Sequence, residues 1–102
     1  MDRKYERFLI DVRLIVRTKK EMLHGRTKNL AEGGMGATVA GDIPLHEMVE
    51  LQFHLPESAE PLVLRAEVRY RQGFQYGFRF IPPTEEQAEI IRNGVKDLPA
   101  DE

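Results

Sequence analysis

The chain has 102 residues, of which 41% are hydrophobic and 31% are charged, so it suits a single domain with one modest core. Its 15 basic and 17 acidic residues give a net charge of -2, which argues against bulk electrostatic binding to nucleic acid. Because cysteine is absent, disulfides, thiol nucleophiles and cysteine-ligated metals are excluded. The sequence shows no signal-peptide segment and no membrane-spanning apolar run, so we expect a cytoplasmic protein without membrane insertion.

Apolar and polar residues alternate along most of the chain. A period of two is typical of antiparallel strands that pack one face on a core and leave the other in solvent. The expected strands, of which the second and third show the weaker pattern, are residues 8–17, 22–30, 35–40, 48–55, 62–71 and 74–80. Six short strands at this spacing predict a small antiparallel β-barrel, because closure removes exposed sheet edges.

Turn residues separate the expected strands. His24-Gly25 and Gln72-Gly73 predict tight turns, and the sequence PESAEP at 56–61 predicts a longer loop bounded by prolines. These breaks support a chain that returns on itself as a series of antiparallel strands.

The apolar period changes after the double proline at 82–83. Thr84 and Gln87 form a capping-box pattern, and Glu85 and Glu86 suit the positive N-terminal end of a helix. We therefore expect an all-β fold, a six-stranded antiparallel barrel, with one short C-terminal α-helix.

The chain is expected to be one domain over residues 1–102. Its expected parts are a basic flexible arm at 1–8, the barrel at 9–81, the helix at 84–95 and a tail at 96–102. Residues 1–28 contain nine Lys and Arg against four acids, a charge of +5, whereas the remainder has six bases and thirteen acids, a charge of -7. A basic N-terminal segment on an acidic body suits a small anion or an acidic partner.

No catalytic constellation is evident in the sequence. Its only serine, Ser58, lies in the expected loop, and the three histidines (His24, His46 and His54) are isolated and not at metal-ligand spacing. The GGMG run at 33–36 lacks the Lys-Ser/Thr of a phosphate-binding loop. We expect no enzyme, no metal site and no cofactor.

Two short motifs carry the candidate binding chemistry. In RKYER, Arg3 and Arg7 stand four residues apart, so two planar guanidinium groups can converge on phosphate or guanine. In NLAEGGMG at 29–36, Asn29 can bond the edge of a base, and the glycines let a flat ligand lie against the backbone. Taken alone, each motif is also explained without a ligand, as a solvated charged terminus and as a glycine-rich turn.

Taken together, the motifs resemble those of a known family. R-x-x-x-R followed about twenty residues later by N-x-A-x-x-G is similar to the PilZ domain signature of R-x-x-x-R and [D/N]-x-S-x-x-G. The ligand of that family is the bacterial second messenger cyclic di-GMP. The segments EGGMGA, EVRYR and YGFRF also stand where the family has similar segments, so the resemblance covers nearly the whole chain. It implies a six-stranded antiparallel barrel with a C-terminal helix, in agreement with the strand pattern.

The resemblance implies roles for particular residues. Arg3 and Arg7 would contact the phosphates and stack on or bond guanine, while Lys4 would add charge beside them. Asn29 would address a guanine edge. Because the family also has Asp at this position, Asn29 gives up charge-assisted acceptors for guanine N1–H and N2–H.

Three further positions follow from the same resemblance. Gly34 would let the ligand approach the backbone, and Tyr70 would pack either near the ligand or in the core. The family serine is replaced by Ala31, so one hydroxyl hydrogen bond is missing. Such a bond contributes about 1 kcal/mol, or roughly a fivefold change in affinity.

The leading functional hypothesis is a cyclic di-GMP receptor and adaptor. Ligand binding would rearrange the N-terminal arm and the surface, and a monomer or weak dimer would signal to an unidentified protein effector. The alternative is a PilZ-like protein-interaction adaptor that no longer binds nucleotide, which Ala31 favours and RKYER disfavours. A barrel that binds single-stranded DNA or RNA is not expected, because the body is acidic and lacks an exposed aromatic row.

Overall fold

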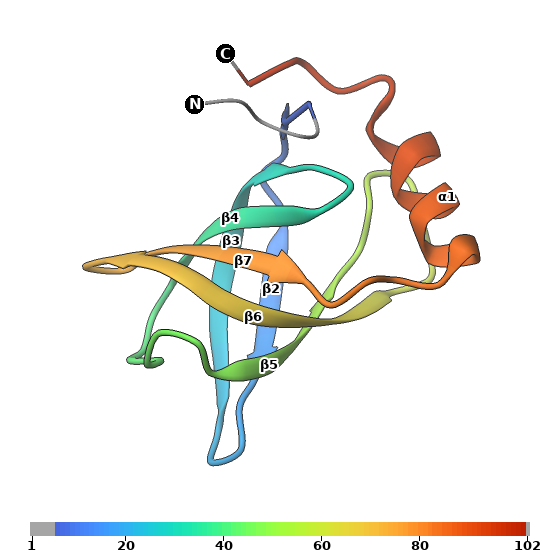
Figure 1. Ribbon diagram of the computed structural model, residues 1–102. Coiled ribbons are helices and arrows are strands. Elements are labelled where there is room, and N and C mark those ends of the chain that lie inside the picture. The colour runs from blue at the N-terminus through green and yellow to red at the C-terminus, as the bar shows by residue number, and fades with distance from the viewer. Residues whose placement is uncertain (1–5, 102) are drawn as a thin grey trace.

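Seven strands and one helix make up residues 6–101, the part of the chain that the computed structural model describes (Figure 1). These elements are β1 (Phe8–Leu9), β2 (Arg13–Arg17), β3 (Met22–Leu30), β4 (Gly34–Val39), β5 (Met48–Phe53), β6 (Leu62–Gln72), β7 (Gln75–Phe80) and α1 (Glu85–Val95). Strands pair antiparallel in the order β3-β2-β5-β6-β7-β4, and β4 pairs with β3 to close a six-stranded barrel. The expected fold class is therefore confirmed, with β1 as a short additional strand on β3.

The expected strand at 8–17 is divided into β1 and β2 by a bend at residues 10–12. Beside these residues lies Thr27, a polar side chain that is only 3% exposed. Its hydroxyl donates to the Ile10 carbonyl at 3.1 Å and accepts from the Val12 N–H at 2.9 Å. Together with the backbone bonds from Ile10 N–H to Lys28 O and from Thr27 N–H to Val12 O, these contacts keep the segment between β1 and β2 attached to β3.

The prediction of a tight turn at His24-Gly25 is wrong, because both residues lie inside β3. The chain reverses earlier, where the Thr18 hydroxyl accepts hydrogen bonds from the backbone N–H groups of Lys20 and Glu21, each at 3.1 Å. At Gly25 a Cβ atom would overlap the Thr38 carbonyl oxygen. The glycine therefore permits close contact between β3 and β4 rather than a turn.

The other two expected connections are confirmed. Gly73 and Phe74 form a two-residue turn between Gln72 and Gln75, and Gly73 has the left-handed φ of +62° that such a hairpin turn requires. An irregular loop at 54–61 connects β5 to β6 and contains the PESAEP segment.

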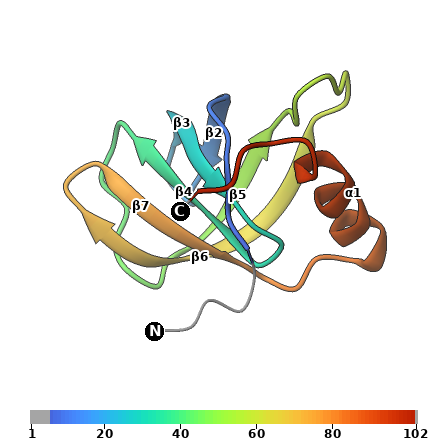
Figure 2. The same ribbon diagram turned by 90° about the horizontal axis from the view of Figure 1, so that it is seen from above.

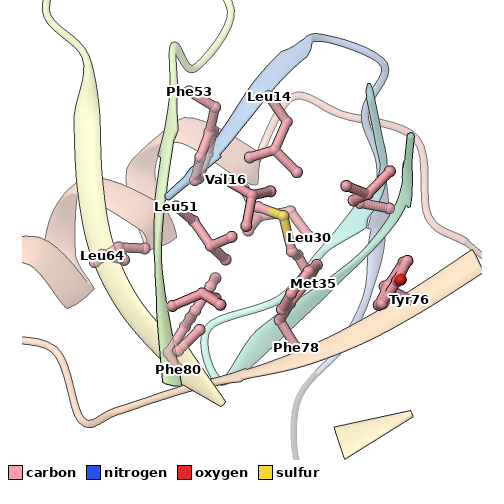
Figure 3. Packing of buried hydrophobic residues seen from close by; sticks show 14 of the residues in the cluster. Leu14, Val16, Leu30, Met35, Leu51, Phe53, Leu64, Tyr76, Phe78 and Phe80 are labelled. Carbon is pink, nitrogen blue, oxygen red and sulfur yellow. The ribbon is translucent and has the colours of Figure 1, made fainter. Parts of the chain in front are cut away.

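The barrel interior is filled by aliphatic and aromatic side chains from all six strands (Figure 3). The helix α1 lies against one side of the barrel and contributes Ile91 and Val95 to the same core (Figure 2). Its start has the expected capping box, in which Thr84 and Gln87 each accept a backbone hydrogen bond at 3.1 Å. No helix within residues 6–101 is long and apolar enough to cross a membrane.

After α1 the chain runs back beside β1 (Figure 1). The Leu9 N–H donates to the Pro99 carbonyl at 2.8 Å, and the Asp101 N–H donates to the Arg7 carbonyl at 2.9 Å. Phe8 and Ala100 form a β-bridge between these two contacts. The end of the chain is thus held against the segment that carries the second arginine of the first motif.

Candidate functional site

One row of cross-strand neighbours connects the second motif to the EVRYR strand. Asn29 on β3 is opposite Gly36 on β4, Gly36 is opposite Gly77 on β7, and Gly77 is opposite Tyr70 on β6. Because the two central residues have no side chain, the floor between Asn29 and Tyr70 is bare backbone. A flat group can lie directly on such a floor.

A pocket of about 410 Å³ lies over this row. Its lining residues are Arg7, Lys28, Asn29, Gly36, Ala37, Tyr70, Gln72, Gln75, Tyr76 and Gly77. A Cβ atom at Gly36 would lie 3.0 Å from Asn29 Oδ1, and one at Gly77 would lie 3.0 Å from Tyr70 Cβ. Side chains at these two glycines would therefore press on the residues that flank the floor.

Two β-bulges border the pocket on opposite sides. One shifts the register of β3 between Thr27 and Asn29, and the other shifts β6 between Val68 and Tyr70. A bulge re-aims the side chains that follow it. As a result Tyr70, which strict alternation from Val68 would place in the core, is 52% exposed and lines the pocket.

The two motifs meet at Asn29. Arg7 Nη1 donates to Asn29 Oδ1 at 2.8 Å, across 22 positions of sequence. The Gly36 N–H donates to the same oxygen at 2.9 Å, and Asn29 Nδ2 donates to Asp101 Oδ2 at 2.9 Å. These three bonds fix the orientation of the Asn29 amide and hold the Arg7 guanidinium at the pocket rim.

Both charged residues that line the pocket are basic. Arg7 and Lys28 both line it, and Lys28 Nζ donates to Gln75 Oε1 at 3.4 Å on the β7 side. No acidic residue is found among its lining residues within the described part of the chain. Two cations over a backbone floor favour an anion that also carries a flat group.

The structure thus brings together Arg7, Asn29 and Tyr70 of the expected site residues. Gly34 lies at a close strand contact, because a Cβ atom there would overlap the Phe78 carbonyl oxygen. The close approach that Gly34 permits is therefore between β4 and β7, and the residue does not line the pocket.

The other expected site residues are Ala31, Arg3 and Lys4. Ala31 is only 4% exposed, and its N–H donates to the Gly34 carbonyl at 2.8 Å. It does not line the pocket. Arg3 and Lys4 lie outside the described residues.

Several residues at the site were not expected from the sequence. Gly36 and Gly77 form the floor, Lys28 adds a charge, and Asp101 binds Asn29. A signal for the two glycines existed, because a glycine inside an alternating strand often marks a close backbone approach. For Asp101 there was none, since its contact arises only when the tail folds back on β1.

The turn between β3 and β4 is also connected to the helix. Arg92 Nη1 donates to both carboxylate oxygens of Glu32, at 3.2 and 3.3 Å. This hydrogen bonding is the main cause that raises the pKa of Arg92, with a further contribution from Glu85. Through Glu32, the segment that follows Asn29 is coupled to α1.

A separate charged cluster lies outside the pocket. Hydrogen bonding from His46 lowers the pKa of Glu67, and the nearby guanidinium groups of Arg69 and Arg79 act in the same direction. Within residues 6–101, no three His, Asp or Glu side chains gather in an arrangement that could hold a metal ion.

The sequence profile of the PilZ domain matches residues 1–97. The chain belongs to the PilZ domain family. Its fold agrees with this assignment, since solved PilZ structures superpose on most of the chain. No curated protein matches the sequence significantly.

Three solved structures illustrate the likeness of this PilZ domain to others. The PilZ domain with c-di-GMP of YcgR from Escherichia coli has a TM-score of 0.79 and 16% identity, covering 96% of this chain and 92% of that one. The PilZ domain of CeSA from a cellulose-synthesizing bacterium has a TM-score of 0.71 and 17% identity, covering 87% and 93%. The inhibitor of motility MotI/DgrA from Bacillus subtilis has a TM-score of 0.73 and 15% identity; the match covers 94% of this chain and 51% of the inhibitor.

Proposed function

We propose that this PilZ domain binds cyclic di-GMP in the pocket over the row from Asn29 to Tyr70 and signals to a protein partner. The observation that carries the proposal is the 2.8 Å hydrogen bond between Arg7 and Asn29, which joins the two family motifs at one pocket. The PilZ domain of YcgR, which has the same fold, was solved with c-di-GMP, and this supports the choice of ligand.

The chemistry of the pocket suits this dianionic dinucleotide. The Arg7 guanidinium provides a planar fork for a phosphate or the O6/N7 edge of guanine, and Lys28 adds a second positive charge. Gly36 and Gly77 provide a flat floor, and the exposed ring of Tyr70 offers a stacking surface beside it.

A route from the pocket to the protein surface supports the signalling part of the proposal. Asn29 lies at the end of β3, and Glu32 in the following turn is bound to Arg92 on α1. A ligand that moves Asn29 would therefore change the position of α1, whose outer face carries Ile90, a side chain 42% exposed. We propose that a protein partner binds this face of α1.

Amide chemical-shift mapping during a titration with cyclic di-GMP tests the location of the site. The largest changes are expected at the Gly36 and Gly77 amides and at the Asn29 side-chain amide. The amide of Ser58, in the loop at 54–61 and outside the pocket lining, is the internal control and should shift little. Changes centred on residues outside the pocket would contradict the proposed site.

The alternative function is an adaptor that acts only through protein contacts. The observation that favours it is Ala31, which removes the hydroxyl of the family motif. The burial of Ala31 away from the pocket lining reduces the weight of this argument. The receptor function is therefore the better supported of the two.

Replacing Ala31 by serine distinguishes the two functions. We expect Ala31→Ser to change the affinity for cyclic di-GMP by less than about threefold, because the new hydroxyl would be buried outside the pocket lining. The same burial should lower the free energy of unfolding by about 1 kcal/mol. Calorimetry and thermal denaturation measure both. If only the serine variant bound the nucleotide, the natural chain would be the adaptor.

A further inference from the structure

The C-terminal tail, defined here as residues 98–101, is bonded to both elements that present the motif residues. Its backbone pairs with the segment around β1 through Leu9 N–H to Pro99 O at 2.8 Å and Asp101 N–H to Arg7 O at 2.9 Å. Leu98 is partly buried against the barrel core, which anchors the other end of the tail. The tail is therefore hydrogen-bonded to the segment that carries Arg7 and restrains its backbone.

The side chain of Asp101 makes the second connection. Its Oδ2 accepts a hydrogen bond from Asn29 Nδ2 at 2.9 Å, while the other end of the same amide binds Arg7 and Gly36. One side-chain N–H of Asn29 is thus already hydrogen-bonded to a carboxylate of the same chain. Asp101 is not among the residues that line the pocket, but it binds Asn29, which does.

We propose that the tail is an autoinhibitory latch in which Asp101 competes with an anionic ligand for Asn29 and restrains the Arg7 segment. The competition is effective because the carboxylate is tethered and acts at a high local concentration. Its negative charge also opposes the approach of a dianion to the neighbouring guanidinium. The identity of the competing ligand rests on the function proposed above.

Release of the latch would couple ligand binding to a conformational change of the tail. A ligand that takes the Asn29 amide and draws Arg7 onto its phosphate must break the contacts of Asp101. The tail is then released from β1, since two of its bonds depend on the position of residues 7–9. Ligand binding in the pocket would therefore change the position of residues 98–101, which follow α1 in the chain.

Calorimetric titration with cyclic di-GMP tests the competition. Asp101→Ala should bind about fivefold more tightly or better, which is the effect of removing one competing hydrogen bond. Asp101→Asn, which keeps an acceptor but loses the charge, should fall between this variant and the natural protein. Asp97→Asn is the matched control, because it removes an equal charge from an exposed position with no hydrogen bond found among the described residues. Equal or weaker binding by Asp101→Ala would overturn the competition.

Amide hydrogen exchange tests the latch without any nucleotide. Asp101→Ala should accelerate exchange at the Leu9 amide, whose hydrogen bond to Pro99 belongs to the tail, while Asp97→Asn should not. Unchanged exchange at Leu9 would overturn the latch. If exchange accelerates but neither protein binds cyclic di-GMP, the tail restrains the arm and the proposed ligand is wrong, so the two failures are distinguishable.

Discussion

Replacing Arg7 by alanine is expected to weaken cyclic di-GMP binding at least about a hundredfold. A charge-assisted hydrogen bond contributes about 1.5–3 kcal/mol, and a guanidinium fork can form two. The loss of about 3 kcal/mol corresponds to more than two orders of magnitude in affinity. The fold should be unaffected, because the Arg7 side chain is only partly buried and its bonds to the tail are made by the backbone. Calorimetry measures the affinity.

The matched control is Arg65→Ala. Arg65 is an exposed arginine on β6, about 16 Å along the strand from Tyr70, and it does not line the pocket. The substitution removes the same charge from the protein, so the affinity should remain within about threefold of the natural value. An Arg7→Ala variant that bound as tightly as Arg65→Ala would show that Arg7 is not a ligand contact.

Replacing Gly34 by alanine is expected to destabilise the barrel by about 3 kcal/mol or more. The added methyl group would overlap the Phe78 carbonyl oxygen, and β4 would have to move away from β7. Overpacking of this kind costs about 1–3 kcal/mol when only side chains adjust, and more when backbone must separate. For a domain of this size, thermal denaturation should show a midpoint lower by more than about 10 °C.

Gly36→Ala is the control that separates fold from site. At Gly36 the three atoms nearest to the added methyl all belong to the Asn29 side chain, the closest being Oδ1 at 3.0 Å, so a side-chain adjustment relieves the contact and the barrel can remain closed. We expect a midpoint within about 5 °C of the natural protein together with a clear loss of ligand affinity. If Gly36→Ala and Gly34→Ala destabilised the protein equally, the distinction between Gly36 on the pocket floor and Gly34 at the contact of β4 with β7 would be wrong.

The barrel and its helix could be predicted from the sequence because their signals are local. Alternation marked four of the barrel strands clearly and β3 and β4 more weakly, the left-handed φ of Gly73 matched its turn signal, and Thr84 with Gln87 marked the start of α1. The same local logic failed at His24-Gly25, where the glycine serves contact between strands that are distant in sequence. A glycine in the sequence is compatible with a turn and with a close contact between strands. Only the pairing of β3 with β4 shows which of the two occurs at Gly25.

The candidate site could be predicted only in part. Arg7 and Asn29 followed from the family motif, but the exposure of Tyr70 depends on a bulge that no alternation pattern contains. For Gly34 the motif left open whether the close approach is to a ligand or to a neighbouring strand, and the contact with Phe78 appears only when β4 pairs with β7. Asp101 required the tail to return to β1, a contact made across 72 residues from Asn29.

The central claim is that the pocket joining Arg7, Asn29 and Tyr70 binds cyclic di-GMP. The most direct test is a calorimetric titration of the natural protein with cyclic di-GMP, with cyclic di-AMP as the comparison ligand. We predict saturable heat at micromolar cyclic di-GMP and much weaker binding of cyclic di-AMP, which lacks the guanine O6 acceptor and N2–H donors. No heat at tens of micromolar cyclic di-GMP, or equal binding of both dinucleotides, would contradict the account.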